Sequence, residues 1–252
     1  MGRAAPHAQA AEGAPLLDAL LRRSPPARRG GKRGTFAALQ DAIAALARGA
    51  GLLAARGAIA LVDATAFEPR AASWGYRLAT RRRAPRAARY PPHPKLTLAV
   101  DRASHLIVGA HPGVGPGPDA PAFAPVLRQA ARVLARLGAV VADAGFDSEA
   151  NHRLGHETLG IRRVVIRLNP RRRRRRWPAT PYRRALRQAF PWGLYHARPQ
   201  VESVISRLKR RLGSALSARH PAPQAAEQLL RVLSYNLLLL LPRPVHLSTE
   251  PL

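Results

Sequence analysis

Two kinds of hydrophobic pattern along the chain predict strands. Apolar runs at residues 58–62 and 138–142, and the segment 163–168 with VVI at its centre, are typical of strands that are buried on both faces of a sheet. Residues 95–100 and 105–110 alternate apolar with polar positions and are joined by the turn sequence DRAS, which predicts a hairpin. The pattern therefore predicts a sheet built from these segments.

Apolar residues that recur every three to four positions predict helices around these strands. The helix predicted at residues 35–56 begins at Thr35, whose hydroxyl can cap the first turn. From Tyr182 onward the chain is predicted to be helical, with interruptions at Pro191 and Pro199. This order of strands and helices predicts an α/β domain with a mixed sheet. The other predicted helices are residues 122–137, 151–159 and 225–241.

The segments between these elements are rich in Pro, Gly and Arg. Residues 1–34 are predicted to be largely disordered, with one or two helical turns near residues 16–21. Residues 70–94 and 112–121 are predicted to be loops.

The chain is strongly basic, because 42 Lys and Arg against 14 Asp and Glu give a formal net charge of +28. Such an excess favours a polyanionic partner, above all nucleic acid. A second interpretation stays open: Ala, Arg, Pro and Gly are all favoured by GC-rich coding, so part of the charge can reflect mutational bias.

Basic and aromatic residues leave two further alternatives open. Residues 171–176 are six consecutive arginines, followed by Trp177. This run is either a DNA-binding segment or a solvated loop. Trp74, Trp177 and Trp192 are candidates for stacking on an extruded base, although ordinary packing is the more common role.

Several function classes are excluded by composition. The chain has no cysteine, so it has no disulfide or thiolate metal site, and any metal must be bound by Asp, Glu or His. The longest apolar run, residues 237–241, is far shorter than a membrane span, and the N-terminus lacks a secretory signal, so we expect a cytoplasmic protein with no membrane partner. His152 and His156 are interpreted as an exposed pair and not as a metal site.

Three acidic residues are the candidates for chemistry. Asp63 and Asp143 each end an apolar run, and strand ends in an α/β sheet can bring such groups together. Each also has an ordinary alternative, since Asp63 or Asp143 can cap the next turn, and Glu202 can be a solvated counter-charge. Three hard oxygen ligands favour Mg²⁺ or Mn²⁺, and a pair of such ions is the standard device for phosphodiester cleavage.

The sequence around Glu202 predicts a helix with two distinct sides. Glu202, Ser206 and Lys209 lie beside one another at helical spacing, next to an apolar stripe. Pro199 suits the first turn, so Tyr195 and Arg198 precede or open the helix and can approach the same side. The stripe consists of Val201, Val204, Ile205, Leu208 and Leu212.

These residues resemble a known family. The spacing Tyr195-x2-Arg198-x3-Glu202-x6-Lys209 resembles the Tyr-Arg-Glu-Lys signature of the DDE transposases of bacterial insertion sequences. The segments DATAFEPR, which starts at Asp63, and DAGFD, which starts at Asp143, resemble the blocks around the first and second acids of that family. The resemblance covers roughly residues 58–241.

The resemblance implies an RNase H-like fold and the chemistry of a DNA transposase. Asp63, Asp143 and Glu202 would be the catalytic residues and would bind two Mg²⁺ or Mn²⁺ ions. The implied partner is DNA, at transposon ends and at the target, bound by a homodimer in the cytoplasm or nucleoid. Asp147 would either support this site or cap a helix. The implied DNA contacts are Tyr195, Arg198, Lys209 and Arg210.

Two departures from the family keep alternatives open. Residues 169–201 are too few for the long β insertion of some relatives, and the first 57 residues contain one convincing helix. A shortened or inactive DNA-binding derivative and a nuclease of the same fold therefore remain alternatives. We divide the chain into a basic, partly disordered N-terminal region (1–57), an RNase H-like catalytic domain (58–241) and a C-terminal tail (242–252).

Overall fold

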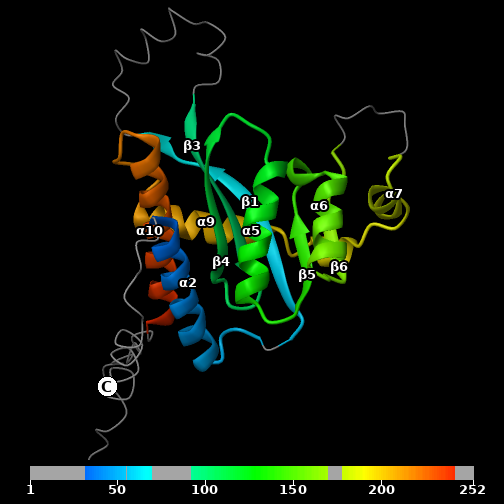
Figure 1. The fold of residues 1–252 in the computed structure, drawn as a ribbon, viewed down its shortest axis with the longest axis horizontal. Helices are drawn as coiled ribbons and strands as arrows, with labels where there is room; N and C mark the ends of the chain where they lie inside the picture. Colours follow the sequence, from blue (N-terminus) through cyan, green and yellow to red (C-terminus); the bar gives the residue numbers. More distant parts are fainter. Residues whose placement is uncertain (1–31, 55, 70–91, 170–177, 242–252) are drawn as a thin grey trace, which may run out of the picture.

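A mixed five-stranded sheet forms the centre of the molecule (Figure 1). The structure is a computed structural model and describes residues 32–54, 56–69, 92–169 and 178–241. The strand order is β4-β3-β1-β5-β6, so the predicted α/β, RNase H-like fold class is confirmed. The strands are β1 (Ala58–Ala66), β3 (His93–Asp101), β4 (Ile107–Gly115), β5 (Leu137–Ala142) and β6 (Arg163–Ile166).

Strand direction divides the sheet into two halves. β3 is antiparallel to both β1 and β4, whereas β1, β5 and β6 are parallel to one another. The parallel half consists of the continuous apolar runs, because helices cover both of its faces. In β1, Leu61 packs into the core on one face of the sheet, while its neighbours Ala60 and Val62 pack into the core on the other face.

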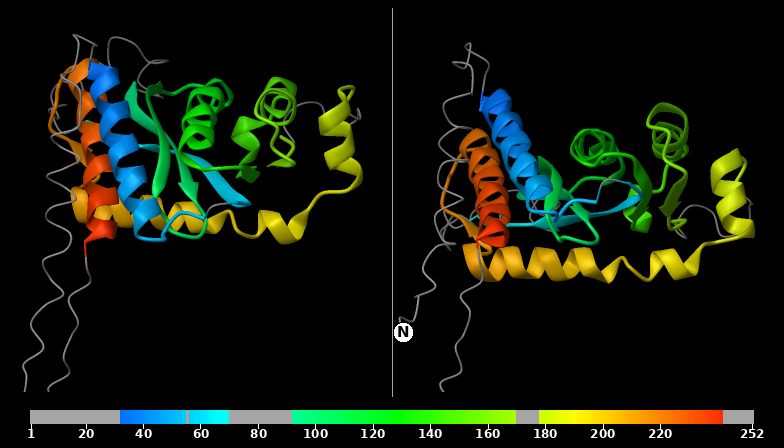
Figure 2. Two further views of the ribbon diagram at one scale, coloured as in Figure 1. Left: turned by 60° about the horizontal axis from the view of Figure 1, so that its bottom comes forward. Right: turned by 90° about the horizontal axis from the view of Figure 1, so that it is seen from below.

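Helices cover the two faces of the sheet and one of its edges (Figure 2). The buried residues Ala44 and Ala47 of α2 belong with those of α5 to the core on one face, and Val232 and Tyr235 of α10 belong with those of α9 to the core on the other face. α10 and α2 lie side by side next to β4. The helices are α2 (Lys32–Gly49), α5 (Ala120–Val133), α6 (Glu149–Arg153), α7 (Pro181–Gln188), α8 (Trp192–Tyr195), α9 (Pro199–Leu212) and α10 (Pro221–Leu240).

Short elements complete the domain. A 3-10 turn, η1 (Ala144–Phe146), follows β5, and a π-helical turn, η2 (Leu154–Thr158), continues α6. β2 (Glu68–Pro69) and β7 (Ala215–Leu216) form a small parallel ladder that joins the end of β1 to the segment after α9.

Several predicted boundaries are wrong, and neighbouring strands explain two of them. β4 continues to Gly115, through residues predicted to be a loop, because it pairs with β3 as far as His93. It is an edge strand, which tolerates Pro112. β1 likewise continues past Asp63 to Ala66, because β3 pairs with it there.

Helix ends also differ from the prediction. α2 begins before Thr35, so this residue lies inside the helix and is not its cap. α5 ends at Val133, and Arg136 then adopts a left-handed φ of 54° that turns the chain into β5. The last helix begins at Pro221, because proline fits the first turn of a helix.

Several predictions fall outside the described residues. They are the predicted disorder and helical turns of residues 1–31, the predicted loop at 70–91, the arginine run at 171–176 with Trp177, Trp74, and the C-terminal tail at 242–252.

A buried amide connects α10 to the sheet. Asn236 is 1% exposed, accepts a hydrogen bond from the backbone N–H of Ile107 at 2.9 Å, and donates one to the Ile107 carbonyl at 2.8 Å. Gln40 of α2 also donates to this carbonyl. Three segments that are distant in sequence therefore meet at one residue of β4.

Asn236→Leu is expected to lower the free energy of unfolding by about 1–3 kcal/mol, because the buried N–H of Ile107 loses its partner. Urea denaturation followed by circular dichroism measures this. Ser234→Ala, at an exposed position of the same helix, is the control and should change stability little. Equal stability of the two variants would contradict the role of Asn236.

Candidate active site

Strand register brings the first two acids together. β1 and β5 are parallel, and Val62 pairs with Ala142. The residue that follows each of them is an aspartate: Asp63, within β1, and Asp143, directly after the end of β5. Asp63 lies within β1, opposite Leu98 of β3, and not at the strand end that we predicted. Its side chain is on the same face of the sheet as Leu61, which is the face covered by α9.

Asp63 is largely removed from water. Its side chain is 15% exposed, and its Oδ1 accepts the backbone N–H of Ala64 at 2.8 Å. Burial raises the pKa of Asp63, the hydrogen bond from Ala64 and the charge of Arg198 lower it, and the charges of Asp143 and Glu202 raise it again. The net shift is upward, so this carboxylate lies where negative charge is unfavourable and where a further cation would be stabilised.

The raised pKa gives a stability prediction. The folded chain holds a proton on Asp63 at pH values where the unfolded chain has released it, so stability falls as pH rises from the ordinary pKa through the raised one. Asp63→Asn is therefore expected to increase the melting temperature at pH 7, and the gain should vanish as pH falls below about 3.9. Thermal unfolding at several pH values tests this; a gain that persists in acid would contradict it.

Glu202 reaches the site from the first turn of α9. Val201, Val204 and Leu208 are fully buried against the sheet, so the predicted apolar stripe holds α9 in place. The side chain of Glu202 is 53% exposed, as expected for the margin of the buried face.

Arg198 contacts all three acids, which we call the acid cluster (Asp63, Asp143 and Glu202). Its Nη1 donates to Oε1 of Glu202 at 2.6 Å, and its Nη2 lies 3.3 Å from Oδ2 of Asp63 and 3.5 Å from Oδ2 of Asp143. The guanidinium is 20% exposed, and the surrounding carboxylates raise the pKa of Arg198 although burial opposes this. One positive group thus lies among three negative ones.

Tyr195 approaches the same cluster from α8. Its hydroxyl donates to Oδ1 of Asp143 at 3.4 Å, and burial together with the Asp143 charge raises the pKa of Tyr195. Its ring packs edge-on against Phe190 and Trp192, with centroids 5.2 and 6.0 Å apart. Trp192 itself is 52% exposed.

The two predicted DNA contacts near the end of α9 differ in their surroundings. The ammonium of Lys209 donates to the carbonyl of Ala66 at 2.7 Å and lies 5.4 Å from the centroid of the Phe67 ring. It therefore joins α9 to the end of β1. Arg210 is exposed and lines a shallow depression of about 400 Å³ that also contains Glu202.

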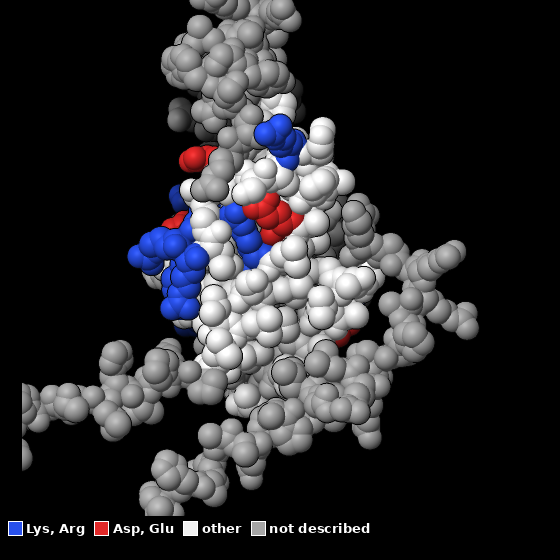
Figure 3. All heavy atoms as spheres, turned by 90° about the vertical axis from the view of Figure 1, so that its left-hand side faces the viewer, with Lys and Arg blue, Asp and Glu red and all other residues white. Residues whose placement is uncertain are grey.

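Positive charge gathers near this end of α9. The last turn of α9 carries Lys209, Arg210 and Arg211. The face formed by α2, α10 and this end of α9 shows Lys and Arg side chains grouped beside a broad uncharged area (Figure 3).

Comparison with known proteins assigns the family. A model of the family described as the transposase DDE domain matches residues 55–237, which is most of the chain and contains all three acids. The chain belongs to this family. The resemblance to a DDE transposase is therefore confirmed, while its Tyr-Arg-Glu-Lys group stays a prediction. No curated protein matches the chain.

The donor set of this DDE domain fits divalent cations. The family generally uses such ions, and three carboxylates grouped around one cation are the oxygen ligands that Mg²⁺ and Mn²⁺ prefer. Within the described ranges, no three such side chains are arranged to hold a metal ion as they stand, because the carboxylates converge on Arg198 instead. The acid cluster is the set of described residues that could hold a metal ion.

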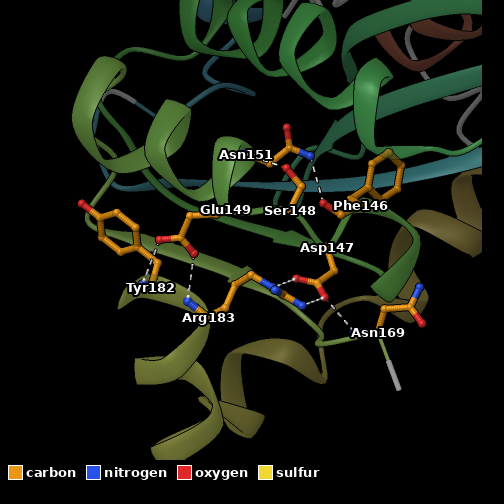
Figure 4. A network of polar contacts seen from close by, with 8 residues as sticks. All are labelled: Phe146, Asp147, Ser148, Glu149, Asn151, Asn169, Tyr182 and Arg183. Carbon is orange, nitrogen blue, oxygen red and sulfur yellow. Dashed lines mark hydrogen bonds and ion pairs between the residues drawn. The ribbon is translucent and has the colours of Figure 1, made fainter. Parts of the chain in front are cut away.

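Asp147 of the DDE domain does not cap the helix that follows it (Figure 4). Ser148 does so, by accepting the N–H of Asn151. Asp147 has a fully buried side chain that accepts two hydrogen bonds from Arg183, at 2.7 and 2.8 Å, and one from the backbone N–H of Asn169. Sequence reasoning missed this pair, because its residues are far apart in the chain and no local spacing relates them.

The prediction that His152 and His156 form an exposed pair is wrong, because neither side chain is exposed. His152 is fully buried, and burial lowers its pKa to about 4, so it is a neutral, packed ring. His156 is partly buried and stacks on Tyr182, with centroids 4.7 Å apart.

None of the helices in the described ranges is both long and apolar enough to cross a membrane.

Proposed function

We propose that this chain is a DNA transposase that cleaves strands at transposon ends and transfers the freed 3′-OH to target DNA. The observation that carries the proposal is the convergence of Asp63, Asp143 and Glu202 on one guanidinium at the junction of β1, β5 and α9. A structural acid would need one cation partner; three acids around a single arginine leave excess negative charge, as expected of a site for divalent cations.

The acid cluster would hold Mg²⁺ or Mn²⁺, two ions by analogy with the family. When bound, these ions activate the attacking oxygen and stabilise the departing one. In the first step water attacks the phosphorus, the P–O3′ bond breaks and a 3′-OH is released. In the second step this 3′-OH attacks a target phosphodiester and displaces the target 3′ oxygen.

The remaining side chains would position DNA. Arg198 offers a guanidinium that can hold phosphate oxygens once it leaves the carboxylates. Tyr195, next to Asp143, can contact the backbone near the cleaved end. Lys209 and Arg210 lie further along α9 and would bind phosphates away from the reacting bond. We further propose that a homodimer acts on DNA in the nucleoid, and that residues 58–241 form the catalytic domain.

A second candidate is a DNA-binding protein derived from a transposase and no longer catalytic. The contacts of Arg198 with Glu202 and Asp63 favour it, since they neutralise part of the negative charge that would attract a metal ion.

Cleavage of labelled duplexes separates the candidates. The DNA that flanks the gene supplies the duplexes, and short inverted repeats there would identify the ends. With Mn²⁺, joined products support the transposase. Nicking without joining indicates a nuclease of the same fold, and binding without nicking indicates the inactive derivative.

A further inference from the structure

Helix α7 carries charge but little apolar packing. Its sequence PYRRALRQ contains Arg183, Arg184 and Arg187 and no acid. None of its residues is buried in the part of the chain that the structure describes. The hydrophobic effect therefore contributes little to holding this helix on the domain.

A buried ion pair (Figure 4) holds α7, together with the stacking of its Tyr182 on His156. Arg183 forms a two-pronged contact with the fully buried carboxylate of Asp147, through Nε at 2.7 Å and Nη2 at 2.8 Å. A buried ion pair contributes less to net stability than to geometry, since desolvation offsets its attraction while its paired hydrogen bonds fix one orientation. Asp147 thus sets how α7 lies.

A second carboxylate, from α6, binds the start of α7. Glu149 accepts the backbone N–H groups of Tyr182 and Arg183, at 3.2 and 3.4 Å, which are first-turn donors without a partner inside the helix. Burial alone would raise the pKa of Glu149, but the neighbouring Thr180 side chain and the hydrogen bonds from these two N–H groups lower it. The carboxylate is therefore charged at neutral pH, which suits the positive end of the helix dipole.

The exposed side of α7 is basic. Arg184 and Arg187 are exposed and three positions apart, so they lie on neighbouring positions of the helix surface. Arg184 also donates to the carbonyls of Pro178 and Ala179, which orders its side chain.

Both partners of the Asp147–Arg183 ion pair are close in sequence to residues at the acid cluster. Asp147 lies four residues after Asp143, and α7 is followed directly by α8, which carries Tyr195. α7, α8 and α9 follow one another along one side of the molecule (Figure 2), and the basic last turn of α9 lies at the far end of that row. The acid cluster, which Tyr195 and Glu202 approach from α8 and α9, therefore lies between two basic segments: α7 and the last turn of α9.

We propose that α7 is a second contact for the DNA backbone, held by Asp147 and Glu149 in a fixed orientation beside the acid cluster. The inference rests on the proposed function, because it takes DNA as the partner. A duplex whose scissile phosphate lies at the acid cluster would meet the last turn of α9 on one side and Arg184 and Arg187 on the other.

The salt dependence of DNA affinity tests this contact. Arg184→Gln combined with Arg187→Gln should reduce the slope of log K against log salt by about 2, because each lost phosphate contact removes about 0.9. Fluorescence anisotropy of the full chain with a labelled 30-base-pair duplex measures the slope.

Arg128→Gln combined with Arg132→Gln is the matched control. These arginines lie on α5, whose core residues belong to the opposite face of the sheet from those of α9, and their loss removes the same formal charge. This control should leave the slope within a few tenths of wild type. An unchanged slope in the α7 variant, or an equal fall in both variants, overturns the proposal.

Hydrogen exchange tests the positioning role of Asp147. Asp147→Asn should speed exchange of the backbone amides of α7 at least tenfold, while α5 exchanges as in wild type, and should reduce the salt slope as the double variant does. If the substitution opens the whole domain, Glu149→Gln provides the same test, because it weakens the contact with the start of α7 and leaves the ion pair in place. Unchanged exchange in α7 overturns the positioning role.

The two proposals fail in different ways. If Asp63→Ala abolishes cleavage but the α7 variant keeps the full salt slope, the transposase stands and the α7 contact is wrong. If the α7 variant loses slope while no duplex is cleaved by wild type, α7 binds DNA and the catalytic proposal is wrong.

Discussion

Asp63→Ala is expected to slow cleavage of a labelled transposon-end duplex by about a thousandfold or more in Mn²⁺. Asp63 is the least exposed of the three acids and lies on the central strand β1. Under the proposed function, its loss removes one of the three carboxylates that would hold the metal ions. Metal-assisted stabilisation of the reacting oxygens is worth several kcal/mol, and each 1.36 kcal/mol is a factor of ten in rate.

Asp143→Ala and Glu202→Ala should have similar effects on cleavage, while DNA binding survives in all three variants. Asp41→Ala is the control, because Asp41 is an exposed aspartate on α2 that pairs with Arg132. Cleavage at the wild-type rate by any one of the three acid variants would show that its residue is not part of the site.

Arg198→Ala is expected to bind Mn²⁺ about tenfold more tightly in the absence of DNA, and to cleave DNA more slowly. The guanidinium lies within 3.5 Å of all three carboxylates, so it competes directly with a metal ion for them. A unit charge at about 4 Å is worth about 4 kcal/mol at an effective dielectric constant of 20, and solvent and side-chain motion reduce the net effect toward 1.4 kcal/mol, or tenfold. Titration calorimetry with Mn²⁺ measures the affinity.

The same competition predicts coupling between metal and DNA. Phosphates that draw Arg198 away from the acids should tighten Mn²⁺ binding by wild type, and Mn²⁺ should tighten DNA binding by the same factor. The coupling should disappear in Arg198→Ala. Arg211→Ala, at the other end of α9, is the control and should keep wild-type Mn²⁺ affinity. Weaker Mn²⁺ binding by Arg198→Ala would mean that the arginine organises the acids and does not compete for them.

Local sequence was sufficient for the elements that cross the core. Periodicity predicts β5, β6 and the apolar stripe of α9. A strand or helix that buries one face needs apolar residues at a fixed spacing along the chain. The ends of β1 and β4 were not predicted, since pairing with β3 extends both strands through residues whose own preferences favour loops.

The fold class, the family and the three candidate acids can be predicted from the sequence, because strand periodicity, helix periodicity and the Tyr-Arg-Glu-Lys spacing are local patterns. The contacts of those residues are known only from the fold. The register of β1 on β5 brings Asp63 beside Asp143, Arg198 lies among the acids, and Asp147 holds Arg183 of α7. These contacts join residues far apart in the chain, and their energies depend on burial and distance, which no local pattern encodes.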